Sequence, residues 1–552
     1  MKYKIWNGAI RRSGWLAVAG ALVLGSCTKN FEKYNTDAFG TSNQELSADY
    51  KLLGVPLQQV QQSIYQVINP AWDMQLQQNL IGDVFSGYMG SPTPFLGNQN
   101  NMTYSLVDNW NGQPWSDAYN GVMAPVQLVI KNAAGQYPAF VAWARILRVE
   151  GMHRLSDIFG PIIYTHYGQV NEDGSVTYDS QKDAYYAFFN DLDSAIAVLT
   201  PLAQSNATKT FTNFDQVYGG DYGEWVKFAN SLKLRLALRI VNVDPAKAQA
   251  EGEAALANPL GLLTTNADGF TIDIGSVQHP LNVINNSWGD IRFGAPLGSL
   301  LEGYSDPRES KYAVGATDPA VAGKIIGVRN GIDIDAKGRY GNYSALPNFP
   351  NCAATPWGSV FSKANYVQLM TAAEAWFLKS EAAIRGWAKA GDAGTAYNSG
   401  VTASLAQYGV DAQAAAYLAD ATSSAAQYID PKATVAGAND IKTGNPDLST
   451  ITIKWDNAAT FAQKLERIIT QKYIAMYPDG QEAWSEFRRT RYPKLFRNKV
   501  NYSNGAIPTD KFVRRVNFPL SERNTNANGV AGGVKALGGP DTGGTPLWWD
   551  VN

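Results

Sequence analysis

Two segments of the sequence combine flat aromatic rings with amide or guanidinium groups, a mixture suited to binding sugars. A sugar ring presents an apolar face that stacks on an aromatic side chain, and its hydroxyls form hydrogen bonds at the edge. The first segment holds Tyr88, Phe95, Asn98 and Asn100, and the second holds Trp288, Arg292, Tyr340 and Tyr343. Gly, Asn and Pro are frequent around both sets, which predicts irregular loops. Each residue taken singly has the alternative role of packing its loop on the body, so the ligand-binding hypothesis applies to the set.

The sequence does not predict catalysis. The three histidines are far apart, and no HExxH or CxxC pattern occurs, which argues against a zinc site. Glu374, Arg488 and Arg489 have the chemistry of an acid and two electrophiles, but on amphipathic helices such charges are usually solvated or paired. Glycoside hydrolysis needs two carboxyl groups about 5–10 Å apart, and a chain with 48 acidic residues always offers candidates. We therefore predict a non-enzymatic protein without a metal or other cofactor; bound calcium is not predicted from the sequence.

The N-terminus has the organisation of a secretory leader. Four cations and no acidic residue precede an apolar run at 15–24, which is too short to cross a bilayer as a mature helix. Leu24-Gly25-Ser26-Cys27 resembles the lipobox of bacterial lipoproteins, in which the cysteine receives diacylglycerol and a further fatty-acyl chain such as palmitate. We predict a signal peptide at 1–26 and a lipidated Cys27 with its tether at 27–45. The alternative is an ordinary signal peptide with an unmodified cysteine at the cleavage site.

The charge of the predicted mature chain is weakly negative. The whole sequence has 46 Lys+Arg and 48 Asp+Glu; removing the four cations of the leader leaves 46 − 4 = 42 against 48, a net charge of −6. This balance argues against binding of nucleic acid, which requires a clustered basic surface. Cys352 would have no disulfide partner if Cys27 carries lipid, so no disulfide framework is expected.

Helical periodicity dominates the remaining sequence and predicts a mainly α fold. Apolar residues recur at helical spacing in seven stretches, which are 50–67, 72–84, 138–159, 181–199, 225–240, 371–386 and 461–487 with a turn at 478–480. A further helix is expected near 397–408. Ser180 and Thr371 stand where residues that cap helices are expected, each with an acid three positions later. Antiparallel helix pairs with short turns are typical of tetratricopeptide-like arrays.

Other stretches lack this periodicity. Residues 86–111 and 261–357 are predicted to be loops, the latter with short strands, and Asp306 and Arg308 form a predicted local ion pair. Trp115 and Tyr119 stand at helical spacing and are expected in the core. The terminal Trp548-Trp549 pair is expected to pack on the body, because two adjacent indoles are unfavourable in water. No linker divides the chain, so residues 46–552 are predicted to form one domain.

Several motifs, in their order along the chain, resemble those of SusD/RagB-type outer-membrane lipoproteins of Bacteroidota. They are Phe31-Glu32-Lys33-Tyr34-Asn35, Ser156-Asp157-Ile158-Phe159-Gly160-Pro161, Tyr178-Asp179-Ser180-Gln181, the run 220–245, the run 469–493 and Arg515-Val516-Asn517-Phe518-Pro519 with Glu522 and Asn526. The resemblance covers essentially the whole mature chain.

This resemblance implies a tetratricopeptide-like half and an irregular, ligand-facing half. It implies a protein anchored in the outer membrane by its lipid, facing the cell exterior. There it would capture a nutrient, either an oligosaccharide or a peptide, and deliver it to a SusC-like TonB-dependent transporter. Two other functions remain open from the residues alone: a surface glycosidase, and a helical scaffold that binds only proteins. The aromatic-rich loops favour ligand capture over a pure scaffold.

Overall fold

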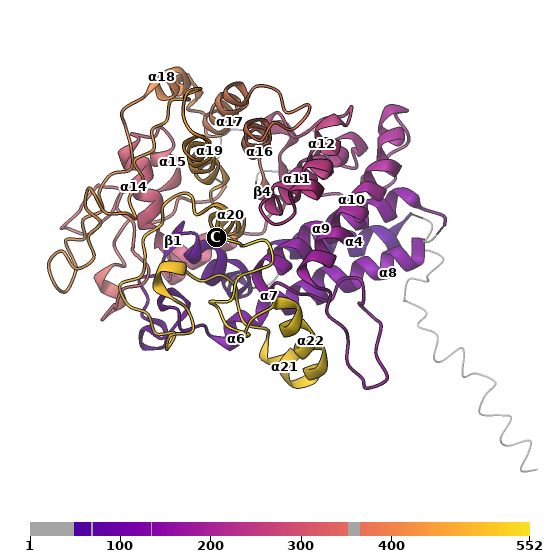
Figure 1. The fold of residues 1–552 in the computed structure, drawn as a ribbon, viewed down its shortest axis with the longest axis horizontal. Helices are drawn as coiled ribbons and strands as arrows, with labels where there is room; N and C mark the ends of the chain where they lie inside the picture. Colours follow the sequence, from indigo (N-terminus) through magenta and orange to yellow (C-terminus); the bar gives the residue numbers. More distant parts are fainter. Residues whose placement is uncertain (1–48, 68–69, 134, 351–364) are drawn as a thin grey trace, which may run out of the picture. The chain divides into compact units, whose positions relative to one another are not determined.

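The computed structural model describes residues 49–67, 70–133, 135–350 and 365–552. The predicted signal peptide, Cys27, the tether and Cys352 lie outside these ranges. Residues 53–552 group into one compact unit, and Met1–Leu52 is assigned to another. The described chain is mostly helical with few strands (Figure 1). None of its helices has the length and apolar character needed to cross a bilayer.

Five helices follow one another in the first half, each packed against the next along the chain. They are α8 (Ala124–Ala133), α9 (Pro138–Phe159), α10 (Gln181–Gln204), α11 (Tyr222–Arg239) and α12 (Pro245–Ala257) (Figure 1). Local chemistry sets their starts. Pro138 occupies the first turn of α9, where its missing N–H is not needed. The Ser180 hydroxyl accepts a 3.1 Å hydrogen bond from the Asp183 N–H, as expected of a residue that caps a helix.

A second group of helices lies in the C-terminal half. It comprises α16 (Ala372–Ile384), α17 (Ala393–Gln407), α19 (Phe461–Met476) and α20 (Gly480–Thr490). Helix α16 packs against α17, α19 and also α11, so it connects the two groups (Figure 1). The prediction of a mainly α, tetratricopeptide-like architecture is confirmed.

One predicted cap differs from the structure. Thr371 Oγ1 accepts a 3.0 Å hydrogen bond from the Glu374 N–H, as expected. The Glu374 carboxylate, however, accepts hydrogen bonds from Arg235 on α11, so it does not complete a reciprocal capping box. A buried guanidinium without a charged partner is strongly destabilising, which explains why the carboxylate pairs with Arg235 although the start of α16 is itself buried.

The second predicted helical stretch is π-helical over most of its length. Helix α4 (Lys51–Ile64) is followed by α5 (Ala71–Met74), which continues as a π-helix, η1 (Gln75–Asp83). Leu80 and Val84 are buried as expected, but Trp72 is 47% exposed. The prediction that Trp72 belongs to the buried stripe is therefore wrong. A π-helix has a wider turn than an α-helix, so residues on either side of the transition do not share one face.

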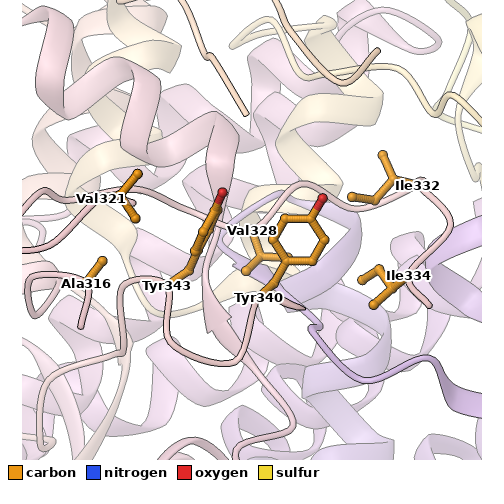
Figure 2. Packing of buried hydrophobic residues seen from close by; sticks show 7 residues of the cluster. All are labelled: Ala316, Val321, Val328, Ile332, Ile334, Tyr340 and Tyr343. Carbon is orange, nitrogen blue, oxygen red and sulfur yellow. The ribbon is translucent and has the colours of Figure 1, made fainter. Parts of the chain in front are cut away.

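Residues 261–350 are irregular, as predicted, with two small antiparallel sheets. Strand β1 (Met89–Gly90) pairs with β3 (Arg292–Phe293), and β2 (Phe270–Asp273) pairs with β4 (Tyr366–Met370). The prediction missed α14 (Ala295–Gly303) and α15 (Glu309–Tyr312). A local core holds these loops together; it consists of Ala316, Val321, Val328, Ile332, Ile334, Tyr340 and Tyr343 (Figure 2).

Shorter helical segments complete the described chain. They are η2 (Phe95–Asn98), η3 (Asn101–Thr103), α6 (Asp108–Asn111), α7 (Gln113–Asp117), η4 (Ala118–Met123), η5 (Asn266–Asp268), α13 (Pro280–Asn282), η6 (Val283–Trp288), η7 (Lys337–Arg339), η8 (Asp411–Gln413), α18 (Ala414–Ala419), η9 (Thr509–Lys511), α21 (Leu520–Thr525) and α22 (Ala527–Leu537). Segments η1, η4 and η6 are π-helical.

The C-terminal tryptophans pack on the body, as predicted. Trp549 is fully buried, and its indole N–H donates a 3.0 Å hydrogen bond to Asp157. The guanidinium groups of Arg239 and Arg488 lie 5.3 and 5.0 Å from its ring centre. The chain end is held further by Arg514, whose Nε donates a 2.7 Å hydrogen bond to Asp550.

Candidate ligand-binding surface

Asp290 joins several segments of the irregular half. Its Oδ1 accepts hydrogen bonds from Thr93 (3.0 Å) and from the ammonium of Lys337 (2.6 Å). Its Oδ2 lies 3.4 Å from the amide nitrogen of Gln75 in η1. The Lys337 ammonium also donates to the carbonyl of Trp288 at 2.7 Å. These bonds fix the backbone that carries Trp288, while the indole itself is 37% exposed.

A second exposed tryptophan lies close to the same contact. Trp72 lies in α5, which continues directly into η1 with Gln75, and α5 packs beside η6, the segment that ends at Trp288. Both Trp72 and Trp288 are therefore carried by segments that the Gln75–Asp290 contact brings together. We call the surface formed by these two tryptophans and the polar side chains beside them the tryptophan surface; it comprises Trp72, Trp288, Asp290, Arg292 and Lys337. Sequence reasoning did not include Trp72 among the ligand-binding candidates, because its helical spacing from Leu76 and Leu80 placed it in an apolar stripe.

Arg292 contributes a hydrogen-bond donor to the tryptophan surface. Its Nε donates to the Gly341 carbonyl (2.7 Å), and its Nη1 donates to the carbonyls of Asn285 (3.0 Å) and Ile291 (2.7 Å). Its Nη2 lies 3.4 Å from the position that a side-chain carbon would occupy at Gly289, the residue after Trp288. Burial lowers the pKa of the guanidinium, and Asp290 opposes this effect. The side chain is thus rigid, with Nη2 directed toward the segment that carries Trp288.

The predicted residues of the first loop mainly build that loop. Asn98 exchanges two hydrogen bonds with the backbone of Ile334. Asn100 caps η3 through the Met102 N–H and donates to the Phe95 carbonyl at 2.7 Å. Phe95 is half-buried, with its ring edge-to-face against Trp110 at 5.3 Å. The amides of Asn98 and Asn100 are therefore occupied by internal contacts, and Phe95 retains a partly exposed ring.

Three predicted aromatic residues are core residues in this structure. Tyr88 is fully buried and donates its hydroxyl hydrogen to the carbonyl of Tyr473. Tyr340 and Tyr343 belong to the local core of Figure 2, and both donate to the carboxylate of Asp430, at 2.8 and 2.9 Å. Burial, followed by hydrogen bonding and proximity to Asp430, raises the pKa of both phenols. Rings at 0–2% exposure present no face to a ligand, so the proposed site excludes these three residues.

The structure therefore divides the sequence-predicted set. Trp288 and Arg292 lie together on the tryptophan surface. Asn98 and Phe95 lie in the adjoining loop, and Thr93 connects that loop to Asp290. Tyr88, Asn100, Tyr340 and Tyr343 are buried supports.

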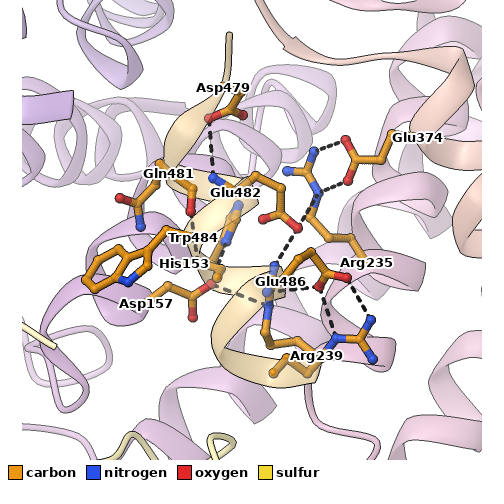
Figure 3. Close-up of polar contacts among 12 residues, drawn as sticks. His153, Asp157, Arg235, Arg239, Glu374, Asp479, Gln481, Glu482, Trp484 and Glu486 are labelled. Atoms are coloured by element: carbon orange, nitrogen blue, oxygen red, sulfur yellow. Dashed lines mark hydrogen bonds and ion pairs between the residues drawn. The ribbon is translucent and has the colours of Figure 1, made fainter. Parts of the chain in front are cut away.

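The charges that resemble catalytic groups lie in a buried ion-pair network. Figure 3 shows its centre, where side chains from α9, α11, α16 and α20 converge. Arg235 donates two hydrogen bonds to Glu374, at 2.8 and 2.7 Å. Arg489 donates two to Glu381, at 2.7 and 2.6 Å. Glu374, Arg488 and Arg489 are 0–1% exposed, so a substrate has no access to them. The predicted alternative of buried pairs is confirmed for Glu374 and Arg489, whereas the buried Arg488 donates to backbone carbonyls.

The network contains strongly perturbed groups that serve structure. Burial raises the pKa of Glu150, but Arg154 and His153 outweigh it and lower the pKa to about 2. Burial lowers the pKa of Arg488 to about 9. This guanidinium is held by neutral partners: it donates to the backbone carbonyls of Asp157 and Arg514 and stacks on the Trp484 ring at 3.5 Å. Perturbed pKa values often mark active sites, but here the groups have no accessible surface.

Among the residues that the structure describes, no group of three or more His, Cys, Asp or Glu side chains is placed to hold a metal ion. Asp306 and Arg308 form the predicted local ion pair at 2.6 Å, fully buried. The architecture is that of a helical-pair scaffold whose loop half presents an exposed aromatic and polar surface.

Comparison with known proteins identifies the family. Residues 33–550 match the family model of SusD-like proteins, the SusD and RagB outer membrane lipoproteins. The chain is similar to a chitin-binding SusD homolog from Flavobacterium johnsoniae, with 43% identity, a TM-score of 0.83, and coverage of 91% of this chain and 99% of that one. It is also similar to a SusD homolog from Bacteroides vulgatus, with 33% identity, a TM-score of 0.83, and coverage of 92% and 99%. A SusD-like protein from Bacteroides thetaiotaomicron has 32% identity, a TM-score of 0.80, and coverage of 91% and 99%. A comparison of the sequence with curated proteins gives no match.

The chain belongs to the SusD/RagB family of outer membrane lipoproteins. The resemblance stated from the sequence motifs is confirmed. Members of this family are known as binding proteins rather than enzymes, and no catalytic family is indicated for the chain.

Proposed function

We propose that this protein is a non-catalytic lipoprotein, anchored through Cys27 in the outer membrane and facing the cell exterior. It captures an oligosaccharide and delivers it to a SusC-like TonB-dependent transporter. The observation that carries the proposal is the tryptophan surface, where the indole of Trp288 is exposed while its backbone is held by the Lys337–Asp290 pair.

The chemistry of this surface suits a glycan. An exposed indole supplies a flat apolar platform for one face of a sugar ring. Arg292 supplies a guanidinium donor and Asp290 a carboxylate acceptor, which together match hydroxyl or acetamido groups at the ring edge. Because the supporting side chains are already bonded to one another, little conformational entropy is lost on binding.

The similar Flavobacterium johnsoniae protein is described as chitin-binding, which supports β-linked N-acetylglucosamine oligosaccharides as the first ligands to test. Other oligosaccharides and peptides belong in the same screen, because a peptide ligand is the alternative within the family. Calorimetry on the purified full-length protein in detergent gives the affinity directly.

The matched variants are Trp288→Ala and Phe461→Ala. Phe461 is 46% exposed at the start of α19 and lies outside the tryptophan surface. Losing a central aromatic platform costs about 2 kcal/mol, or roughly 30-fold in affinity. We expect this loss for Trp288→Ala and no change for Phe461→Ala. Equal affinities of the two variants, or release of reducing sugar from the ligand by the wild-type protein, would contradict the proposal.

Delivery and orientation need separate measurements. A TonB-dependent transporter should copurify with the lipoprotein from detergent-solubilised outer membranes. An epitope at the exposed residues 169–174 should react with antibody on intact cells. Recovery of the lipoprotein without a transporter would favour a role in capture alone.

A further inference from the structure

A second concave site lies on another part of the molecule, between α7, η4 and α21 in the lower part of Figure 1. Its volume is about 360 Å³, within the range of roughly 300–1,000 Å³ that is typical of small-molecule sites. Its lining includes Trp115, Tyr119, Tyr167 and Glu522. The name tyrosine pocket is used for this site.

One wall of the tyrosine pocket is a continuous row of rings. Tyr119 and Tyr167 lie nearly parallel, with ring centres 6.0 Å apart and an interplanar angle of 13°. Trp115 continues the row, with its ring centre 4.9 Å from that of Tyr119. Trp115 is buried as predicted, whereas Tyr119 and Tyr167 are only half-buried. The expectation that Tyr119 is a core residue is thus only partly met, because its ring also lines an open pocket.

The tyrosine wall is held rigidly. The Tyr119 hydroxyl donates to the Ile163 carbonyl at 3.0 Å and accepts a 2.7 Å hydrogen bond from the Ile163 N–H. Both hydrogen-bonding functions of the phenol are therefore directed into the protein. What remains for a ligand is the ring face, which is apolar and suited to stacking.

Glu522 provides a polar group at the edge of this wall. Its Oε2 accepts hydrogen bonds from the Tyr178 hydroxyl (2.8 Å) and from the Asn526 amide (3.2 Å). Within the ranges that the structure describes, Oε1 has no hydrogen-bond or ion-pair partner. The exposed amide of Asn120 lines the same pocket; its nitrogen donates to Ser116 at 3.1 Å, which leaves its oxygen as a second acceptor.

We propose that the tyrosine pocket is a second carbohydrate-binding site, in which a sugar ring stacks on Tyr119 and Tyr167 and donates a hydroxyl or amide hydrogen to Glu522. The ligand class follows from the lining of the pocket, which combines an aromatic wall with hydrogen-bond acceptors and includes no Lys or Arg side chain. Anionic ligands would be repelled by the carboxylate. A sugar supplies both the flat apolar face and the donors. The proposal rests on the proposed function in one respect, that the ligand is a glycan.

Two sites on one protein would hold a long glycan more tightly than either site alone. Binding at the second site becomes intramolecular once the first is occupied, if the glycan can reach both. Short oligosaccharides would instead occupy the two sites independently, which makes them the appropriate probes for counting sites.

The test is calorimetry on the full-length protein in detergent with four trisaccharides: chitotriose, maltotriose, cellotriose and xylotriose. Two substitutions probe the pocket. Tyr167→Ala shortens the aromatic wall. Glu522→Gln keeps an oxygen for Tyr178 and Asn526 and turns an amide donor toward the ligand. We expect two sites in the wild-type protein, one in Trp288→Ala, one in Tyr167→Ala and none in the double variant, with at least a tenfold weaker second site in Glu522→Gln.

The outcomes separate the two proposals. A single site that is lost in Trp288→Ala and unchanged in Tyr167→Ala overturns the tyrosine pocket and leaves the proposed function intact. A single site that is lost in Tyr167→Ala alone supports the pocket and refutes the tryptophan surface. No binding of any trisaccharide refutes both. The monosaccharides glucosamine and N-acetylglucosamine are titrated in the same way. Tighter binding of glucosamine, lost in Glu522→Gln, would overturn the assignment of a neutral sugar in favour of a cation site.

Discussion

The pair between Arg235 and Glu374 connects the two groups of helices, because Arg235 lies on α11 and Glu374 begins α16. The substitution Glu374→Gln keeps the size of the side chain and removes its charge. The carboxylate accepts two hydrogen bonds from Arg235, at 2.8 and 2.7 Å, and the Lys472 ammonium lies 3.5 Å away. A glutamine accepts only one of the two bonds and places an amide donor against the second guanidinium nitrogen.

The magnitude follows from burial. Arg235, Glu374 and Lys472 are 0–1% exposed, so water cannot replace the lost partner. Removing one member of a buried ion pair typically costs about 3–5 kcal/mol. A neighbouring carboxylate reduces this loss of stability, since Glu482 lies 3.8 Å from Arg235 and 3.6 Å from Lys472. We therefore expect Glu374→Gln to lower the free energy of unfolding by about 3 kcal/mol.

The assay is urea unfolding at pH 7, followed by tryptophan fluorescence and by far-ultraviolet circular dichroism, with coincident transitions required. The matched control is Asp335→Asn, which removes the partner of Arg339 in an exposed pair. Exposed pairs contribute less than about 1 kcal/mol, so the control should move the midpoint little. A loss below about 1 kcal/mol in Glu374→Gln would refute the claim that the network couples the helix groups.

Three further outcomes are expected. His279→Asn should remove an acid-dependent loss of stability. Burial lowers the pKa of His279 to about 3, so below pH 6.5 protonation favours the unfolded chain, by about 1.4 kcal/mol per pH unit down to pH 3. Parallel pH profiles of the free energy of unfolding for wild type and variant, measured by urea unfolding, would contradict this. Gly480→Ala should lower the free energy of unfolding by about 3 kcal/mol, because its new carbon would lie 2.3 Å from Asp83 Oδ1. The control Gly532→Ala places its carbon in open space on α22 and should leave stability unchanged. Similar melting temperatures of the two variants would contradict this. Tyr88→Phe should cost about 1 kcal/mol in urea unfolding and leave glycan affinity in calorimetry within twofold, while a tenfold weaker affinity would return Tyr88 to the ligand site.

The helices could be predicted because their signals are local. Pro138 and Phe159 bound α9 as the sequence indicated, and the stretch from Phe461 to Met476 is a helix at both predicted ends. Leucines also alternate at 232–238, a spacing that by itself fits a strand, but the longer apolar pattern of 225–240 predicts a helix, and α11 confirms it. In each case apolar spacing and terminal residues within a few positions decide the structure.

The ligand surface was predicted only in part, because long-range contacts decide which loop aromatics are exposed. The partner of Tyr88 is a carbonyl 385 residues away, and the hydroxyl of the buried Tyr343 donates to Asp430, 87 residues away. No local sequence pattern predicts such distant partners. Trp72 was assigned to a buried stripe on α-helical spacing, and the π-helical continuation of its helix removed that spacing. The tyrosine pocket depends on three separate segments and had no signal in any one of them.

The central claim is that a glycan binds on the tryptophan surface, and a crystal structure of the protein with a bound oligosaccharide tests it most directly. The trisaccharide with the highest affinity in calorimetry would be used. We expect a sugar ring stacked on Trp288, with carbon atoms about 3.5–4.0 Å from the indole, and polar contacts to Arg292 or Asp290. A bound oligosaccharide that leaves the Trp288 ring uncovered would contradict it.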